Sequence, residues 1–217
     1  MKHLPLEKLK KHFDHFVPHF YPAFQNKKND ISAGVLVCLY EDLDWTCILT
    51  QRSTQLKDHS GEICFPGGKQ QKEDTSLQNT ALREAMEEIG MEAKIIGRLS
   101  SIPLYTSEFR LEPFVAIAQT PLSQLHSNEE VQHILPISLR YIFQQPYLEG
   151  TSFTYRDQHL ISPHFQSHHL MKNPPTKQCT YGGTAIVLHE LLQQIAIVVN
   201  QKLPDIKEVQ WPRTLFT

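Results

Sequence analysis

The chain lacks an excess of either charge, and it lacks a long uninterrupted hydrophobic run. Its 217 residues hold 21 Lys and Arg against 23 Asp and Glu, a formal net charge of −2. Proteins that coat nucleic acid usually show a clear basic excess, so no nucleic-acid partner is expected. The most apolar late stretch, residues 184–199, is interrupted by polar and charged side chains. It falls short of the roughly 20 apolar residues of a membrane span, so no membrane partner is expected either.

Cysteine is also scarce. The four cysteines form no Cys-x-x-Cys pair, and their density is too low for a disulfide scaffold: Cys38, Cys47, Cys64 and Cys179. The N-terminal residues include no uninterrupted apolar segment like that of a signal peptide, and early acidic residues disfavour a transit peptide. These features predict reduced thiols and a cytoplasmic location.

Glycine is rarer than usual, and it is concentrated in one region. The nine glycines are about 4% of the chain, where roughly 7% is average. Four of them lie within thirty residues: Gly61, Gly67, Gly68 and Gly90. Because glycine permits unusual backbone angles and close approach to a ligand, this region is the first candidate for a functional site.

Apolar periodicity and turn residues predict the order of the elements. The first half reads as a helix within 3–20, a hairpin of strands at 32–40 and 46–50, and a helix at 76–89. The second half reads as strands at 93–101 and 113–119, a loop at 122–133, a short element at 137–143, a polar excursion at 150–178 and an amphipathic helix within 181–201. Strands and helices alternate without a regular rhythm, which favours an α/β or α+β domain with a mixed β-sheet.

The size and composition suit one main domain with short extensions. Hydrophobic residues make up 40% of the chain, enough for a sizeable core. We expect an N-terminal helical extension at 1–30, the main domain at 31–205 and a C-terminal tail at 206–217.

The predicted helix at 76–89 carries an acidic face. At 3.6 residues per turn, Glu84, Glu87 and Glu88 fall in one arc roughly 100° wide. Like charges at these spacings destabilise a helix by a few tenths of a kcal/mol per pair, so a compensating charge is expected. Mg²⁺ and Mn²⁺ prefer such oxygen ligands. Arg83 lies four residues before Glu87 and is placed to hold it, and Gly90 is placed to end the helix.

These residues resemble the signature of the Nudix hydrolase family. In that signature a Gly is followed by five residues, a Glu, seven residues and then Arg-Glu-aliphatic-x-Glu-Glu-x-Gly-aliphatic. Here Gly68 is followed by five residues and Asp74, and residues 83–91 match the second half. The chain departs from the pattern in having Asp74 for the first Glu, and eight residues rather than seven before Arg83. The resemblance implies a mixed β-sheet sandwiched between α-helices.

A second motif upstream resembles the coenzyme A diphosphatases within that family. It comprises Leu-Thr-Gln-Arg-Ser at 49–53, Leu-Lys at 56–57, Gly61 and Phe-Pro-Gly-Gly at 65–68. A later Tyr-Gly-Gly-Thr-Ala at 181–185 resembles the Trp-Gly-Ala-Thr-Ala segment of the subfamily. The resemblance implies hydrolysis of coenzyme A to 3′,5′-ADP and 4′-phosphopantetheine, with Mg²⁺ or Mn²⁺ as cofactor and a homodimer as the assembly.

The resemblance also implies roles for particular residues. The metal ligands would be Glu84, Glu87, Glu88 and the backbone carbonyl of Gly67. The catalytic set would be Arg83, Glu84, Glu87 and Glu130. The substrate-binding set would be Arg52, Ser53, Lys57, Gly68 and Lys69. Coenzyme A carries three phosphates, so cations beyond the metal are needed, and Arg52 is the first choice because arginine gives bidentate phosphate contacts. Arg110 is a further candidate.

The general base stays open at this stage. Glu84 itself or one of four downstream acids could serve: Glu108, Glu112, Glu129 or Glu130. We favour Glu130, which resembles an acid of the subfamily.

Several alternatives remain. The chain could act on another nucleoside diphosphate derivative, such as ADP-ribose, NADH or an oxidised nucleotide. It could also bind a nucleotide without cleaving it, although the intact acidic face argues against that. Two sets of histidines have spacings compatible with zinc on a helix: His12, His15 and His19, and His164 and His168. No cysteine or acid completes either set, so we expect exposed histidines.

Overall fold

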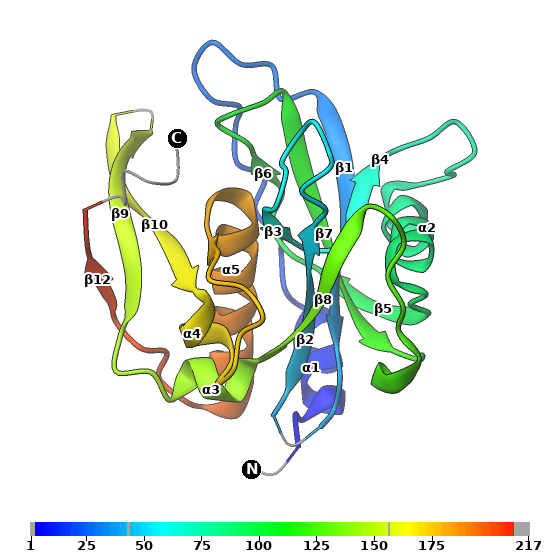
Figure 1. The fold of residues 1–217 in the computed structure, drawn as a ribbon. Coiled ribbons are helices and arrows are strands. Elements are labelled where there is room, and N and C mark those ends of the chain that lie inside the picture. The colour runs from blue at the N-terminus through cyan, green and yellow to red at the C-terminus, as the bar shows by residue number, and fades with distance from the viewer. Residues whose placement is uncertain (1–2, 43, 156, 211–217) are drawn as a thin grey trace.

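The computed structural model describes residues 3–42, 44–155 and 157–210. Two β-sheets lie on either side of helix α5 (Gly182–Val199), and helix α2 (Leu77–Ile89) covers the far face of the larger sheet (Figure 1). The expected α+β architecture, with a mixed sheet between helices, is therefore confirmed.

The larger sheet forms the centre of the molecule. Its main path runs β3 (Ile63–Cys64), β2 (Thr46–Arg52), β1 (Ile31–Leu39), β7 (Phe109–Ala118) and β5 (Ala93–Arg98). Three more strands pair at its sides: β4 (Gly67–Lys69) with β1, β6 (Ile102–Pro103) with β7, and β8 (Val131–Ser138) with β2. β1 and β7 are parallel, from Ile31 beside Phe109 to Leu39 beside Ile117, and the other pairs are antiparallel.

Helix α2 has the ends that the sequence predicts. The Ser76 side chain accepts a hydrogen bond from the Asn79 backbone N–H at 3.2 Å, which caps the start. Gly90 adopts φ 66° and closes the end in the left-handed conformation. Ala81 and Ala85 are fully buried against the sheet. A Cβ on Gly34 of β1 would lie 2.3 Å from the Leu77 carbonyl oxygen, so glycine there lets α2 lie close to β1.

The N-terminal helix expected within 3–20 is present. α1 spans Leu6–Phe13 and packs Leu6, Leu9 and Phe13 into the core. His12 Nε2 lies 2.8 Å from Gln194 Oε1 of α5, which ties the two helices together. Beyond α1 the chain is no longer helical, and Phe20 forms a parallel bridge with Ser101. Beyond the helix Phe16 still packs against the core, whereas Val17 and Phe20 are exposed, so only part of the apolar repeat is buried.

Helix α5 is less amphipathic than the sequence suggests. It is long and apolar enough to cross a membrane by length and composition alone. In the fold, Leu188, Leu191, Leu192 and Ile195 are fully buried, as in the core helix of a globular domain. Figure 1 shows the reason, because α5 lies between two sheets and has apolar neighbours on more than one side.

The polar region at 150–178 is a second correction. It forms most of a smaller sheet in the order β11 (Cys179–Thr180), β10 (Gln158–Gln166), β9 (Leu148–Tyr155) and β12 (Ile206–Glu208). Two short helices, α3 (Leu139–Phe143) and α4 (Ser167–Leu170), flank it. The sheet was missed because its strands carry many polar residues, and their strand conformation depends on pairing partners distant in sequence.

Two smaller differences belong to the same half. Residues 131–138, assigned in part to a loop, form β8 against β2, after a short 3₁₀ helix at Leu122–Gln124. β12 lies within the segment expected to be a tail and pairs in parallel with β9. His164 is only 1% exposed on β10, so the expectation that this histidine is exposed was wrong.

Candidate active site

The salt bridges of Arg83 anchor the loop before α2. Arg83 donates from Nε to Asp74 Oδ1 at 2.9 Å and from Nη2 to Asp74 Oδ2 at 3.0 Å. Asp74 also accepts from the Thr80 hydroxyl and the Gln71 backbone N–H. The bond to Arg83 is the main reason that the pKa of Asp74 lies well below its ordinary value. Asp74 therefore fixes the loop to the helix, although it replaces the usual Glu.

Arg83 also holds two members of the acidic face. Its Nη1 donates to Glu87 Oε2 at 2.9 Å, the contact that the sequence predicts, and its Nη2 donates to Glu84 Oε1 at 2.8 Å. The Glu87 side chain is half-exposed, whereas the Glu84 side chain is largely buried. Burial raises the pKa of Glu84, and the charges of Glu87 and Glu130 add to the effect, while Arg83 opposes it.

Glu88 is the most buried of the three acids. The residue is 4% exposed, and its Oε2 accepts a hydrogen bond from the Gly67 backbone N–H at 3.3 Å. Burial raises the pKa of Glu88 to about 8, and the negative charge of Glu84 acts in the same direction. A buried carboxylate beside another acid is costly to ionise, and a hard divalent cation would offset that cost. The chemistry of these donors therefore fits Mg²⁺ or Mn²⁺.

The glycine pair brings the backbone close to these acids. A Cβ on Gly68 would lie 2.6 Å from both Cδ and Oε1 of Glu84. Gly67 adopts φ 154°, and a Cβ there would lie 2.4 Å from the Gly34 carbonyl oxygen. Gly67 therefore requires glycine, whereas glycine at 68 lets the Glu84 side chain lie close against the backbone.

The three acids do not yet surround a common point. Within 3–42, 44–155 and 157–210, no three His, Cys, Asp or Glu side chains are gathered as they would be around a metal ion. Glu84 and Glu87 bond to Arg83 instead. Arg83 binds only one oxygen of each carboxylate, so binding of a cation by all three acids would require their side chains to move closer together.

Arg52 and Glu130 come together at the edge of the acidic face. Arg52 Nη2 lies 3.8 Å from Glu130 Oε2, and the Ser53 backbone N–H donates to the Glu130 carbonyl at 2.7 Å. Arg52 Nε is buried and has no hydrogen-bond partner in the part of the chain that the structure describes. The Arg52 charge lowers the pKa of Glu88, whereas the Glu130 charge raises it. All these groups therefore share one electrostatic environment.

The loop that carries Glu130 is docked on α2. The Asn128 backbone N–H donates to the Glu88 carbonyl at 3.0 Å, and the Asn128 side chain accepts from the Glu130 backbone N–H at 2.9 Å. These contacts place Glu130 beside the helix, although 40 or more residues separate the two in sequence.

The other residues predicted to bind the substrate differ in exposure and in their contacts. Lys57 and Lys69 are exposed, on the β2–β3 loop and on β4. The Ser53 side chain accepts from the Gln55 backbone N–H at 3.3 Å, so it shapes the start of that loop. Arg110 is 5% exposed and donates to the carbonyl of Tyr21 and the hydroxyl of Ser101. Its role is to hold the N-terminal segment, and it is not a phosphate ligand in this arrangement.

Two of the alternative general bases form hydrogen bonds away from the acidic face. Glu108 accepts from the backbone N–H groups of Lys28 and Asn29, and Glu112 accepts from the Ser101 hydroxyl at 2.6 Å. Of the candidate bases, Glu84 belongs to the acidic face and Glu130 lies beside it.

Sequence reasoning missed one group beside this site. Glu62 bonds to Tyr181 at the start of α5 and to His59 in the β2–β3 loop. Glu62 lies within the upstream motif and Tyr181 within the later one. Because both motifs belong to the same resemblance, their residues could have been expected to lie close together in the fold.

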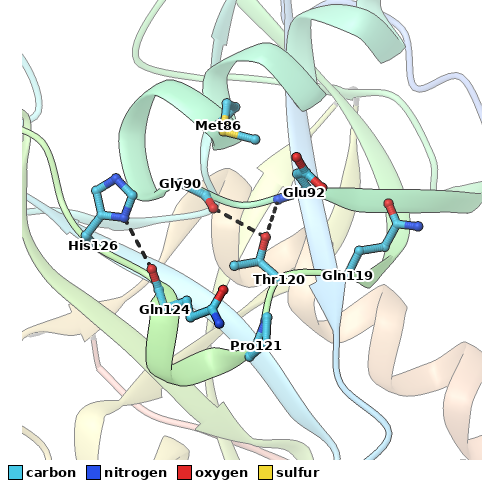
Figure 2. A pocket seen from close by; sticks show the side chains of 8 residues that line it. All are labelled: Met86, Gly90, Glu92, Gln119, Thr120, Pro121, Gln124 and His126. Atoms are coloured by element: carbon cyan, nitrogen blue, oxygen red, sulfur yellow. Dashed lines mark hydrogen bonds between the residues drawn. The ribbon is translucent and has the colours of Figure 1, made fainter.

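A cavity of about 370 Å³ lies elsewhere on the molecule. Figure 2 shows Met86 and Gly90 of the α2 end above it, with Thr120 below accepting from the Glu92 backbone N–H at 2.8 Å. None of the predicted site residues lines it. Met86 projects from the opposite side of α2 to the acidic face, so this cavity is separate from the candidate site.

Comparison with known proteins places these features in context. Residues 29–136 match the family model described as the NUDIX domain. The chain is 32% identical over 183 residues to the uncharacterized Nudix hydrolase NudL of Photorhabdus laumondii, covering 81% of this chain and 91% of the relative. It is 31% identical to the NudL of Pectobacterium atrosepticum, covering 82% of this chain and 88% of the relative. Among solved structures, a MutT protein from Methanosarcina mazei is 23% identical, covers 53% of this chain and 81% of its own, and has a TM-score of 0.41.

Proposed function

This chain belongs to the Nudix hydrolase family, and from that premise we propose that it hydrolyses the diphosphate linkage of coenzyme A or its derivatives. The products would be 3′,5′-ADP and 4′-phosphopantetheine, or its acylated form. The observation that carries the proposal is the position of Arg52, whose buried Nε has no partner in the described chain and whose guanidinium lies beside Glu130 and the acidic face. A substrate with three phosphates needs such a cation next to its metal site.

The proposed metal ligands are Glu84, Glu87, Glu88 and the Gly67 carbonyl, with Mg²⁺ or Mn²⁺ as the cation. A divalent cation bound there supplies Lewis-acid chemistry, because it neutralises phosphoryl charge and activates water. Arg83 orients Glu84 and Glu87 through its two hydrogen bonds.

The remaining residues bind the substrate and move the proton. Arg52 would offer its guanidinium, which lies beside Glu130, to a phosphate oxygen, and the exposed Lys57 and Lys69 would supply two further cations. Gly68, which has no side chain, leaves room for the substrate to approach the acids along the backbone. The turn at Ser53 sets the direction of the β2–β3 loop. We propose Glu130 as the general base that takes a proton from the attacking water, because its side chain is half-exposed and lies beside Arg52 and Glu84.

A substrate panel tests the proposal. Purified protein would be incubated with Mg²⁺ or Mn²⁺ and with coenzyme A, acyl-coenzyme A, ADP-ribose, NADH or deoxynucleoside triphosphates, and the products separated by chromatography. We expect the highest kcat/KM with coenzyme A or an acyl-coenzyme A. If ADP-ribose is hydrolysed far faster than coenzyme A, ADP-ribose would replace coenzyme A as the proposed substrate. If no compound of the panel is hydrolysed, the protein would be a regulator that binds a nucleotide without cleaving it.

A further inference from the structure

The β2–β3 loop at 53–62 has a defined shape. His59 and Gly61 adopt φ 55° and 71°, so the loop turns through two left-handed residues. The Gln51 side-chain amide donates to the Gly61 carbonyl at 3.2 Å, and the Ser60 hydroxyl donates to the Thr54 carbonyl at 3.1 Å. The loop carries Lys57 and directly follows Arg52, the last residue of β2, so its position determines where Lys57 lies relative to Arg52.

Glu62, at the end of this loop, joins three parts of the structure. Its Oε1 accepts from the Tyr181 hydroxyl at 3.0 Å, and its Oε2 lies 3.0 Å from His59 Nδ1. Its backbone carbonyl accepts from the Arg52 N–H at 2.9 Å. Burial would raise the pKa of Glu62, but the hydrogen bonds of His59 and Tyr181 and the charges of His59 and Arg52 outweigh it and lower that pKa. The carboxylate is therefore charged at neutral pH and uses both oxygens.

Tyr181 belongs to the other half of the molecule. It precedes the first residue of α5 and follows β11, which pairs with β10 of the smaller sheet. The contact between Tyr181 and Glu62 therefore links the start of α5 and the smaller sheet to the loop of the larger sheet.

We propose that Glu62 is a positioning residue that fixes the 53–62 loop against the start of α5 by binding His59 and Tyr181 together. Held in this way, the loop presents Arg52 and Lys57 to the phosphates of the substrate. The inference rests on the proposed function for the identity of the substrate, but not for the loop contact itself. Loss of the Glu62 contacts should loosen substrate binding and leave the chemistry at α2 nearly unchanged.

Two variants and one matched control test this role. Tyr181→Phe removes only the hydroxyl that bonds to Glu62, and Glu62→Gln removes the charge. Tyr40→Phe removes a different tyrosine hydroxyl, which donates to the Thr120 carbonyl at 2.7 Å beside the separate cavity. In both test variants we expect KM for coenzyme A to rise about three- to tenfold, with kcat within about twofold, as for the loss of one hydrogen bond. Glu62→Gln weakens both contacts of Glu62 and Tyr181→Phe removes one of them, so the effects of the two substitutions on KM should be less than additive in the double variant.

Hydrogen exchange of the substrate-free protein supplies a second readout that needs no substrate. We expect amides at 53–62 to exchange faster in Tyr181→Phe and Glu62→Gln, and unchanged in Tyr40→Phe. Unchanged exchange in both test variants would overturn the positioning role, even if coenzyme A is the substrate.

The two proposals can fail separately. Faster exchange without coenzyme A turnover would support the positioning role but would exclude coenzyme A as the substrate. KM would then be measured with the panel member that is hydrolysed. A kcat lowered by more than a hundredfold in Glu62→Gln, with KM unchanged, would place Glu62 in the chemistry instead and overturn the proposal.

Discussion

Glu88 shows at the scale of one residue how burial creates a need for a ligand. Its carboxylate accepts a hydrogen bond from the Gly67 backbone N–H and is close to the negative charge of Glu84. Such a group is costly to ionise, and a bound cation would stabilise its charged form. Glu87, by contrast, is half-exposed and bonds to Arg83. The three acids of one helical face therefore have different environments, which their spacing alone does not reveal.

Glu88→Gln should lower kcat by orders of magnitude without unfolding the protein. The amide keeps the size of the side chain but removes the charge that would hold the cation. The rate is measured with the best substrate of the panel, and circular dichroism checks the fold. Glu92→Gln, which replaces an exposed acid beyond the end of α2, is the matched control. An undiminished rate in Glu88→Gln would remove Glu88 from the metal site.

Glu88→Gln, which should lower activity, should raise the stability of the metal-free protein. The folded-state pKa of Glu88, about 8, lies above its ordinary value of 4.5. The metal-free wild type should therefore lose stability as pH rises from about 4.5 to about 8, where the folded protein must give up a proton that the unfolded chain has already lost. Urea unfolding at pH 5, 7 and 9 with a chelator should show Glu88→Gln gaining on the wild type by on the order of a few kcal/mol. A constant difference across this range would contradict the assignment.

At the scale of elements, glycine determines how α2 fits against β1 and β4. The would-be Cβ of Gly34 meets the backbone of Leu77, whereas that of Gly68 meets the flexible Glu84 side chain. The first contact positions the helix and the second positions one carboxylate.

The two alanine variants should therefore separate stability from activity. Gly34→Ala should lower the free energy of unfolding by about 1–3 kcal/mol, because α2 must move off the sheet. Gly68→Ala should leave stability within about 1 kcal/mol and lower kcat, because Glu84 must turn aside. Denaturant unfolding and steady-state rates measure the two effects. Full activity in Gly68→Ala would show that the position of Glu84 is not needed.

At the scale of the whole molecule, the smaller sheet and α5 complete the core and also contact the site through Tyr181. β12 contributes the last strand of that sheet, where Ile206, Lys207 and Glu208 pair with Leu148, Glu149 and Gly150. The Val209 backbone N–H also donates to the Gly150 carbonyl at 2.9 Å.

Truncation after Asp205 should therefore weaken the smaller sheet. We expect a loss of about 1–3 kcal/mol in unfolding free energy, because each net hydrogen bond is worth about 0.5–1.5 kcal/mol. Hydrogen exchange should be faster in β9. Truncation after Gln210, which retains β12, is the control. Equal stability of the two truncated proteins would show that β12 contributes nothing to the fold.

The sequence by itself determined features that depend on neighbouring residues. The helix near 76–89, its end at the left-handed Gly90 and the acidic arc of α2 follow from the periodicity and stereochemistry of one helix, and all are present in the structure. The hairpin of β1 and β2 follows likewise, with Leu39 beside Cys47. The contact of Arg83 with Glu87 is the four-residue neighbour relation of any helix.

Only the tertiary structure decided which distant residues meet. The second bond of Arg83, to Glu84, depends on a rotamer set by the loop around Asp74. Arg110 is buried by the N-terminal segment, and Glu62 meets Tyr181 across more than one hundred residues. The smaller sheet pairs polar strands whose propensity is weak without partners. Burial and strand pairing arise from contacts between segments far apart in the chain, so local pattern cannot fix them, whereas helix ends and faces are set within a few turns of the backbone.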